Sequence, residues 1–539
     1  MSIYQFSRIT KLLLRAAQLC FASAVLAQPL FAQCIPWTDS ATTTGNLLIG
    51  KVSIEARNLF DDLAPNESRR IHRSANWLHI PTRESTIRSH VILKTGDRFT
   101  RDRLLENERI LRSLRYIRDA TVRPTTICHN AVNINIRTTD NWTLTPTLSF
   151  GSRGGVSKRS FGFKDSNVLG TGKHIGFAVS QTGEITEQTL QYTDHNFASG
   201  RYAIHIVNSS AEHESLSTVN LKNRQRTGTR GIDWKLDYFD STTQHETPDL
   251  TGTASMEETS IRAEIFSGVR NSSANPYQLG LITGISTQST ETQSSLIDVD
   301  FEDFDHHHLE LAVRWSQPDY RVLQHYRTMG VREDIDIGLH AYGALGVVVD
   351  GSDSSDHGVS LELEAGRAWL WDNNLLTING GLRQISGTTT DRLNGSAAVD
   401  FTHWFNSKNR LRLHFDTSFQ KSASPFLKFE LGGENGLKGF ANGTQRGDRR
   451  VRSLLEYRRM LPWVPMQLAR LGWSVFHEAG RAWDSGQEET WLQNVGAGLV
   501  IAPTRSSSAN LFRAELVAPL NPEKNSDTLL AFIGAEIKY

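Results

Sequence analysis

An alternation of apolar and polar residues with a period of two runs through most of the chain, from Trp142 to Tyr539. In the stretch Leu411–Gln420, apolar residues alternate with Arg412, His414 and Asp416. Successive side chains of a strand point to opposite faces, so this pattern predicts strands with one apolar and one charged face. Charges recur on the second face over so many strands that a wall between lipid and a wet lumen is favoured over a soluble sandwich.

The last twelve residues support a membrane barrel. One face carries apolar residues and a terminal aromatic, and the other carries Glu536 and Lys538; the first set is Leu529, Ala531, Ile533, Ala535, Ile537 and Tyr539. Such a final strand is typical of outer-membrane barrels. We predict a mainly β fold, in which a transmembrane antiparallel β-barrel (residues 142–539) follows a small α+β domain. At about 9–11 residues per strand plus loops, about 16 strands fit, with 14 or 18 as alternatives.

The N-terminus has the order of a secretory signal. Basic residues precede an apolar run with small residues suited to signal-peptidase cleavage: Arg8, Lys11 and Arg15, then Ala16–Ala32 with Val25-Leu26-Ala27. This order predicts a signal peptide at 1–27 and a linker at 28–44. A membrane anchor is the alternative, disfavoured because the run is short and contains Gln18 and Gln28.

Charge and cysteine content limit the partners and the compartment. Lys plus Arg and Asp plus Glu number 58 each, which gives no basic field for nucleic acid. Of three cysteines, Cys20 lies in the predicted signal peptide. Cys34 and Cys128 could form one disulfide in an oxidising periplasm, or remain two free thiols.

Residues 45–141 predict the small α+β domain. Strand-like stretches occur at Leu47–Ala56, Ile117–Val122 and Ala131–Ile136, and a helix begins after Thr100. Apolar residues at helical spacing predict its buried stripe: Leu104, Leu105, Ile110, Leu111 and Leu114. An insertion is expected near 59–85. The order resembles a POTRA domain, a periplasmic module that binds client polypeptides; an unrelated periplasmic cap is the alternative.

A glycine-rich stretch, Leu431–Asp448, separates two strand-like runs and is longer than a hairpin turn requires. Loops of this length are usually functional or disordered. We interpret residues 431–449 as an inward loop that places Lys438 in the barrel lumen.

Four stretches, in this order along the chain, resemble motifs of the BamA-like superfamily of outer-membrane assembly and secretion proteins (bacterial surface antigen family). They are an early hairpin, the loop motif, a late-strand motif and a strand near the C-terminus: Gly162–Gly172, Leu437-Lys438-Gly439-Phe440, Phe476–Gly480 ending at Trp483, and Asn494–Leu499. The resemblance spans nearly the whole mature chain.

The resemblance implies a loop latch made by Leu437, Lys438, Gly439 and Phe440 with Glu478, beside the strand-motif residues Phe476, Gly480 and Trp483. The family has arginine where this chain has Lys438 and aspartate where it has Glu478. A lysine keeps the charge but lacks the bidentate fork of arginine, so a looser ion pair is expected. The alternative is that both side chains simply lie in a wet lumen.

The family also implies a weak seam between the first and last barrel strands. Pro146 cannot donate a backbone hydrogen bond, and Gly534 permits a bend in the last strand. With Trp142 and Tyr539 at the two ends of the barrel sequence, these residues are the predicted seam.

These features predict a non-enzymatic insertase or translocase of the bacterial outer membrane, with its N-terminal domain in the periplasm. Expected partners are an unfolded client polypeptide, outer-membrane lipid and lipopolysaccharide, and accessory periplasmic proteins. No nucleic acid, cofactor or metal is expected. A passive diffusion porin is the alternative, and an enzymatic barrel is disfavoured because no nucleophile motif is found. Assembly of membrane barrels and secretion of a soluble partner remain alternatives within the leading class.

Overall fold

The structure is a computed structural model. It describes thirteen stretches of the chain: residues 34–38, 47–153, 156–223, 230–247, 252–269, 276–293, 303–351, 355–388, 391–421, 428–487, 489–506, 511–521 and 528–536. The predicted signal peptide, most of the linker and Tyr539 lie outside these residues.

The chain divides into two compact units, and the predicted domain boundaries stay a prediction. The first contains the described residues up to Glu55, with Val91–Glu108 and Thr121–Arg137. The second contains Ala56–His90, Arg109–Ala120 and everything from Thr138 onward, so parts of the N-terminal domain cluster with the barrel residues.

We call residues 47–141 the arm. Its elements, together with the short strand β1 that precedes it, are β1 (Ile35–Pro36), β2 (Leu48–Arg57), α2 (Arg70–Leu78), α3 (Glu84–Ser89), α4 (Arg101–Arg112), β3 (Ile117–Cys128) and β4 (Ala131–Asp140). The strands form one sheet in the order β1-β3-β4-β2. The expected succession of strand, helices, strand, strand is present, and likeness to a POTRA domain stays a prediction.

Helix α4 begins as the sequence predicts, with the Thr100 hydroxyl accepting a hydrogen bond from the Arg103 N–H at 3.4 Å. Leu104 and Leu111 are buried, but Leu105 is exposed, which corrects the predicted stripe. At 100° per residue, Leu105 is turned away from the face that Leu104 and Leu111 share. None of the helices in the described stretches is long and apolar enough to cross a membrane.

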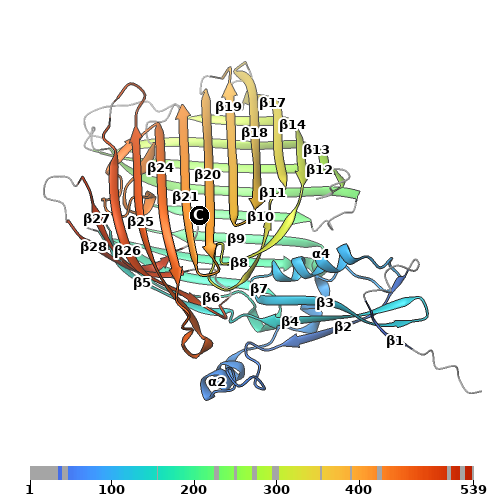
Figure 1. The fold of residues 1–539 in the computed structure, drawn as a ribbon. Helices are drawn as coiled ribbons and strands as arrows, with labels where there is room; N and C mark the ends of the chain where they lie inside the picture. The colour runs from blue at the N-terminus through green and yellow to red at the C-terminus, as the bar shows by residue number, and fades with distance from the viewer. Residues whose placement is uncertain are drawn as a thin grey trace, which may run out of the picture. The chain divides into compact units, whose positions relative to one another are not determined.

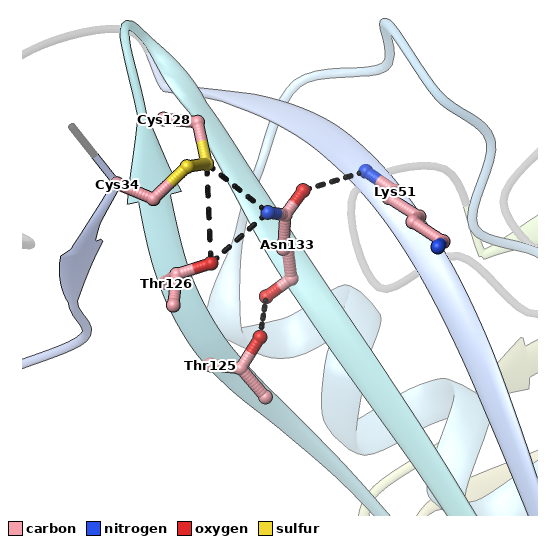
Figure 2. The surroundings of a disulfide bond; sticks show 6 residues. All are labelled: Cys34, Lys51, Thr125, Thr126, Cys128 and Asn133. Atoms are coloured by element: carbon pink, nitrogen blue, oxygen red, sulfur yellow. Dashed lines mark hydrogen bonds between the residues drawn. A yellow bond between two sulfur atoms is a disulfide. The ribbon is translucent and has the colours of Figure 1, made fainter. Parts of the chain in front are cut away.

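A disulfide joins Cys34 to Cys128 and ties β1 to the end of β3 (Figure 2). The Asn133 amide lies beside it and donates to Cys128 Sγ at 3.2 Å and to the Thr126 hydroxyl at 3.0 Å. The Lys51 N–H donates to the Asn133 side-chain oxygen at 2.8 Å, which links β2 to the same corner. Strands β2, β3 and β4 therefore all meet at this cross-link.

A closed antiparallel barrel follows the arm (Figure 1). Twenty strands form it within the described stretches: β5 (Leu144–Arg153), β6 (Val156–Asp165), β7 (Lys173–Thr182), β8 (Ile185–Asn196), β9 (Tyr202–Ser210), β10 (Ser215–Asn223), β11 (Arg230–Thr247), β12 (Gly252–Val269), β13 (Tyr277–Gln293), β14 (Phe304–Gln317), β17 (Leu339–Asp350), β18 (His357–Trp371), β19 (Asn374–Ser386), β20 (Arg392–Asn406), β21 (Asn409–Lys421), β24 (Arg449–Met460), β25 (Ala469–Trp483), β26 (Leu492–Pro503), β27 (Leu511–Pro519) and β28 (Leu530–Glu536).

The expected number of about 16 strands is therefore too low. The expectation allowed for longer connections than many of these strands have. Two-residue turns join several neighbours, at 183–184, 372–373 and 407–408, so the same length of chain accommodates more strands.

The two faces of the wall are as the alternation predicts. On β21, Leu413 and Phe415 are exposed on the outer face. On its other face, Arg410 is buried and Arg412 donates to Asp400 of β20 at 2.7 Å. An apolar outside and a charged, paired inside are what a barrel in lipid requires.

Smaller elements occupy the connections: α5 (Phe197–Gly200), β15 (Tyr320–Gln324), β16 (Arg332–Asp336), β22 (Phe429–Leu431) and β23 (Gln445–Gly447), with 3₁₀ turns η2 (Val168–Gly170), η3 (Gly433–Asn435) and η4 (Pro465–Gln467). Strands β15 and β16 pair into one hairpin, and β22 and β23 into another. Because neighbouring barrel strands are antiparallel, successive connections alternate between the two ends of the barrel. The β14–β17 connection lies at the end where the chain enters β5, and the β21–β24 connection lies at the opposite end.

Candidate functional site: the barrel lumen

The glycine-rich loop between β21 and β24 packs against the inner wall. Leu437 and Phe440 are buried in a cluster with Leu431, Ala482 and Leu492. Gly436 has φ of 101°, a conformation that favours glycine. A Cβ at Gly439 would lie 2.9 Å from Asn494 Cβ, so only glycine lets the loop approach β26 this closely.

Lys438 is held by two carboxylates. Its backbone N–H donates to Glu478 Oε2 at 3.1 Å, and its ammonium donates to Glu515 Oε2 at 2.8 Å. The ammonium is 4.0 Å from Glu478 Oε1. The structure thus brings together Lys438 and Glu478, the two residues of the predicted latch. The closest ion-pair partner of Lys438 is Glu515 of β27, which the sequence reasoning did not name.

Phe476 and Gly480 of the strand motif on β25 contact this loop, whereas Trp483 belongs to the other face of the strand. The Phe476 ring centroid lies 4.7 Å from the Lys438 ammonium, within range of a cation–π contact. A Cβ at Gly480 would lie 2.8 Å from Leu437 Cδ1, so this glycine makes room for the loop. Trp483 lies under Arg481, whose guanidinium carbon is 4.1 Å from the ring centroid. Successive inward positions of β25 therefore carry the Phe476 ring, the Glu478 carboxylate and Gly480, which has no side chain.

Charged groups continue from the loop through the lumen. Arg513 donates to Glu515 at 2.9 Å and to Glu456 at 2.8 Å. Glu456 also accepts hydrogen bonds from Arg458 at 2.9 Å and from Arg410 at 3.2 Å. All five side chains are buried, so each charge depends on its partners for the solvation it has lost.

A second inward element enters from the other end of the barrel. We call residues 318–338 the lumen hairpin; it contains β15 and β16 and joins β14 to β17. Tyr326 packs with Ala368 and Leu375 of the nearby wall. Met329 packs with Val500 and Leu511, among others, on β26 and β27. These strands lie nearly opposite β17 in the barrel order, so the hairpin reaches across the barrel end.

Residues in the last turn of α4 and just after it bind the strands of the lumen hairpin through ion pairs and a cation–π contact. Arg112 donates two hydrogen bonds to the Asp334 carboxylate, at 2.8 and 2.7 Å. Both side chains are largely buried, at 5% and 14% exposed. Arg332 donates to Asp119 at 3.4 Å, and the Arg109 guanidinium lies 4.1 Å from the Tyr320 ring centroid. A bidentate pair of this kind fixes both position and orientation.

The predicted seam residues fall at different places. Pro146 of β5 faces Phe163 of β6, and Gly534 of β28 faces Arg513 of β27. The Trp142 N–H donates to the Arg505 carbonyl, in the connection after β26. Strands β28 and β5 are neighbours in the closed sheet. Tyr539 lies outside the described residues, and the weakness of the seam stays a prediction.

Sequence reasoning missed Glu515, Arg513 and the lumen hairpin. The first two had a visible signal, because Arg513 and Glu515 share one face of β27 with Leu511 and Val517. Opposite charges on an otherwise apolar inward face indicate pairing. The hairpin had no such signal, since its residues resemble two more short strands.

The fold and site define a large antiparallel β-barrel that has inward elements at both ends of its lumen. No family model matches the chain, and no curated protein matches it. Solved structures that match include BamA from Haemophilus ducreyi lacking POTRA domains 1–3, with 13% identity, a TM-score of 0.40, and coverage of 93% of this chain and 89% of that one.

CdiB from Acinetobacter baumannii matches with 11% identity and a TM-score of 0.45, over 93% of this chain and 77% of that one. CdiB from Escherichia coli matches with 10% identity and a TM-score of 0.39, over 99% and 98%. BamA-like barrels, the group that the sequence motifs resemble, are thus among the solved structures that match. With TM-scores below one half, this likeness carries no argument about function, which is argued below from the residues of this chain.

Proposed function

We propose that the chain is a non-enzymatic polypeptide insertase or translocase of the bacterial outer membrane. The observation that carries the proposal is the seating of Lys438 in the lumen by Glu478 and Glu515, in a loop with the sequence Leu-Lys-Gly-Phe. The loop is held by the apolar cluster of Leu437 and Phe440 and by the polar contacts of Lys438, and a client could replace the polar contacts. Such contacts suit an element that is released and re-seated.

The alternative function, a passive diffusion porin, accounts for a barrel but not for the two elements that occupy its lumen. The loop of residues 431–449 packs on the inner face of β25 and β26, and the lumen hairpin spans the other end. A cavity of about 790 Å³ lies against the wall strands, lined by Arg314, Tyr342 and Arg452 among others. Two inward elements with their own buried clusters favour a channel that opens for a client over a permanently open one.

In this proposal the arm captures an unfolded client in the periplasm, and the client enters the barrel when the loop or the lumen hairpin moves. Strands β28 and β5 form the seam at which the client pairs or leaves for the lipid. Lipid and lipopolysaccharide surround the apolar outer wall. No bond is made or broken, so no cofactor is needed.

Site-specific photocrosslinking in living cells tests the proposal. A photoreactive residue replaces Asn442 in the loop or Pro146 in β5, and the outward Leu413 serves as the control. The expected result is a polypeptide adduct at the first two positions and none at Leu413. A protein that yields no adduct at either position, and that conducts small solutes steadily when purified, is a porin and contradicts the proposal.

A further inference from the structure

Helix α2 of the second unit has its polar side facing the protein and its apolar side exposed, the reverse of a helix in a soluble domain. Its polar side chains His72 and Asn76 face the protein, and His72 is 0% exposed. Its apolar side chains face outward: Trp77 is 83% exposed, Leu78 61% and Ile71 44%. A helix in water normally buries its apolar stripe, so this outward face calls for an apolar environment.

Hydrogen bonds hold the polar face in this orientation. The Arg69 N–H donates to His72 Nδ1 at 3.3 Å, so the proton of the neutral ring is on Nε2, which donates to the Met466 carbonyl at 2.7 Å. The Asn76 amide donates to the Phe60 carbonyl at 3.0 Å and accepts from the Phe60 N–H at 3.1 Å. Turning the apolar face inward would break these bonds, so the exposure of Trp77 is specified by the fold.

The contact with Met466 places α2 next to the outer rim of the barrel. Met466 lies in the β24–β25 connection, where its own side chain is 53% exposed and that of Trp463 is 64% exposed. The strands on either side of this connection carry outward aromatic rings in contact, with centroids of Tyr457 and Trp473 5.5 Å apart. Phe405 extends the row at 6.2 Å from Tyr457. Aromatic rows of this kind mark the membrane–water interface of barrels.

Exposed basic residues lie within and beside the apolar face, since at 100° per residue Arg70 falls between Trp77 and Leu78 and Arg73 falls next to Trp77. Arg69, Arg70 and Arg73 lie at the start and middle of α2, and all three are exposed. An amphipathic helix with apolar side chains on one side and arginines beside them suits the plane between acyl chains and anionic headgroups.

We propose that α2 is an interfacial helix whose Ile71, Trp77 and Leu78 enter the bilayer leaflet at the end where the chain enters the barrel. The occupant of this face is lipid, because α2 is hydrogen-bonded to the β24–β25 connection, which exposes Trp463 and Met466 and lies between the strands that carry Tyr457 and Trp473. The inference rests on the proposed membrane location of the barrel. It adds an attachment through which Ala56–His90 of the second unit is held at the lipid surface.

Nitroxide accessibility in the full chain tests the proposal. Single cysteines replace Trp77 or Leu78, with Leu413 as the lipid-facing control and Asp102 of α4 as the water-facing control. Each protein is reconstituted in vesicles of phosphatidylethanolamine with phosphatidylglycerol. Collisions with oxygen, which concentrates in lipid, are compared with collisions with a water-soluble nickel chelate.

The labels at positions 77 and 78 are expected to favour oxygen over the chelate as Leu413 does, while position 102 favours the chelate. Replacing the phosphatidylglycerol with phosphatidylcholine should make the labels at 77 and 78 shallower and leave Leu413 unchanged. Trp77→Glu should shift the label at 78 toward water, and Trp77→Phe should not. If the label at Leu413 is in lipid but the labels at 77 and 78 are in water, the inference about α2 is wrong and the membrane location of the barrel still holds. The same conclusion follows if an added protein then shields the labels at 77 and 78 from the chelate. A water-exposed Leu413 overturns the membrane location of the barrel itself.

Discussion

The Lys438 ammonium group donates to Glu515 at 2.8 Å, while the Glu478 carboxylate accepts from the Lys438 backbone N–H at 3.1 Å. One residue of the loop is therefore bound through its side chain to β27 and through its backbone to β25. The backbone contact does not depend on the identity of the side chain, and the ion pair does. The two carboxylates consequently have separable roles.

The first prediction concerns Glu515. Glu515→Gln leaves the Lys438 and Arg513 charges with fewer partners in a buried setting, and breaking such a pair costs about 3–5 kcal/mol. We expect a loss of this size in the free energy of unfolding, measured by urea in lipid vesicles. The exposed lumen residue Glu364 is the matched control, and Glu364→Gln should change little.

A charge exchange separates the two carboxylates. Lys438→Glu combined with Glu515→Lys should recover part of the loss of either single change, because the pair is restored with its signs reversed. Lys438→Glu combined with Glu478→Lys should recover less, since Glu478 mainly binds the backbone. Equal recovery in both double variants would contradict the assignment of Glu515 as the main ion-pair partner.

The second prediction concerns the gap at Gly480. A Cβ at this position would meet Leu437 Cδ1 and the Val451 carbonyl, both at 2.8 Å. Gly480→Ala should lift the loop from β25 at a cost of about 1–3 kcal/mol, which is typical of overpacking. Faster trypsin cleavage at Arg446 in the folded protein would report it. Gly534→Ala is the control, because a Cβ there meets nothing within 4 Å.

The third prediction concerns the ion pair between Arg112 and Asp334, which holds the lumen hairpin. Asp334→Asn breaks the buried pair with Arg112, which should weaken closure of the hairpin by about 3 kcal/mol, or about a hundredfold in its closed-to-open ratio. Conductance in planar bilayers should then show more frequent openings. Asp97→Asn removes a comparable but more exposed pair with Arg103, whose side chains are 34% and 35% exposed, and should leave conductance as it is. Unaltered conductance in Asp334→Asn would mean that the hairpin does not close this end of the barrel.

The fourth prediction concerns the disulfide. Cys34 and Cys128 are 94 residues apart in sequence, and a cross-link of this span restricts the unfolded chain by about 4–5 kcal/mol. Cys34→Ser with Cys128→Ser should lower the stability of the first unit by up to this amount. Urea unfolding followed by a fluorophore attached in the arm measures it, and reductant should reproduce the loss in the native protein but have no effect on the double variant.

The fifth prediction concerns pH. Burial raises the pKa of Asp140 to about 6, although the Thr82 N–H and hydroxyl both donate to its carboxylate. The folded state then binds the proton more tightly than the unfolded state, so Asp140 contributes stability below about pH 4 that is lost as pH rises to about 6. Burial lowers the pKa of the neighbouring His79, which acts in the opposite direction.

Asp140→Asn isolates the Asp140 contribution. The stability of the native protein relative to this variant should fall as pH rises from about 4 to about 6 and then level off. Chemical denaturation at a series of pH values measures the difference. A difference that is constant across this range would show that Asp140 titrates at its ordinary pKa.

The sequence predicted those features whose signal is local or periodic. The alternation around Leu413 predicted the two faces of the wall, and the glycines of residues 431–449 predicted a packed loop. The partner of Lys438 was missed because Glu515 is 77 residues away, and only closure of the barrel brings β27 to the loop. The orientation of α2 was missed because residues 59–85 could be described only as an insertion. Which side of a helix faces outward is decided by what it packs against, here the Met466 carbonyl and Phe60.

The lumen hairpin and the glycine-rich loop enter from opposite mouths of the barrel and are secured by separate sets of contacts. We expect that displacing one element leaves the other in place. Under the proposed function, one end of the lumen would stay closed while the element at the other end is displaced by a client. Small solutes would then pass only while both elements are displaced around the client.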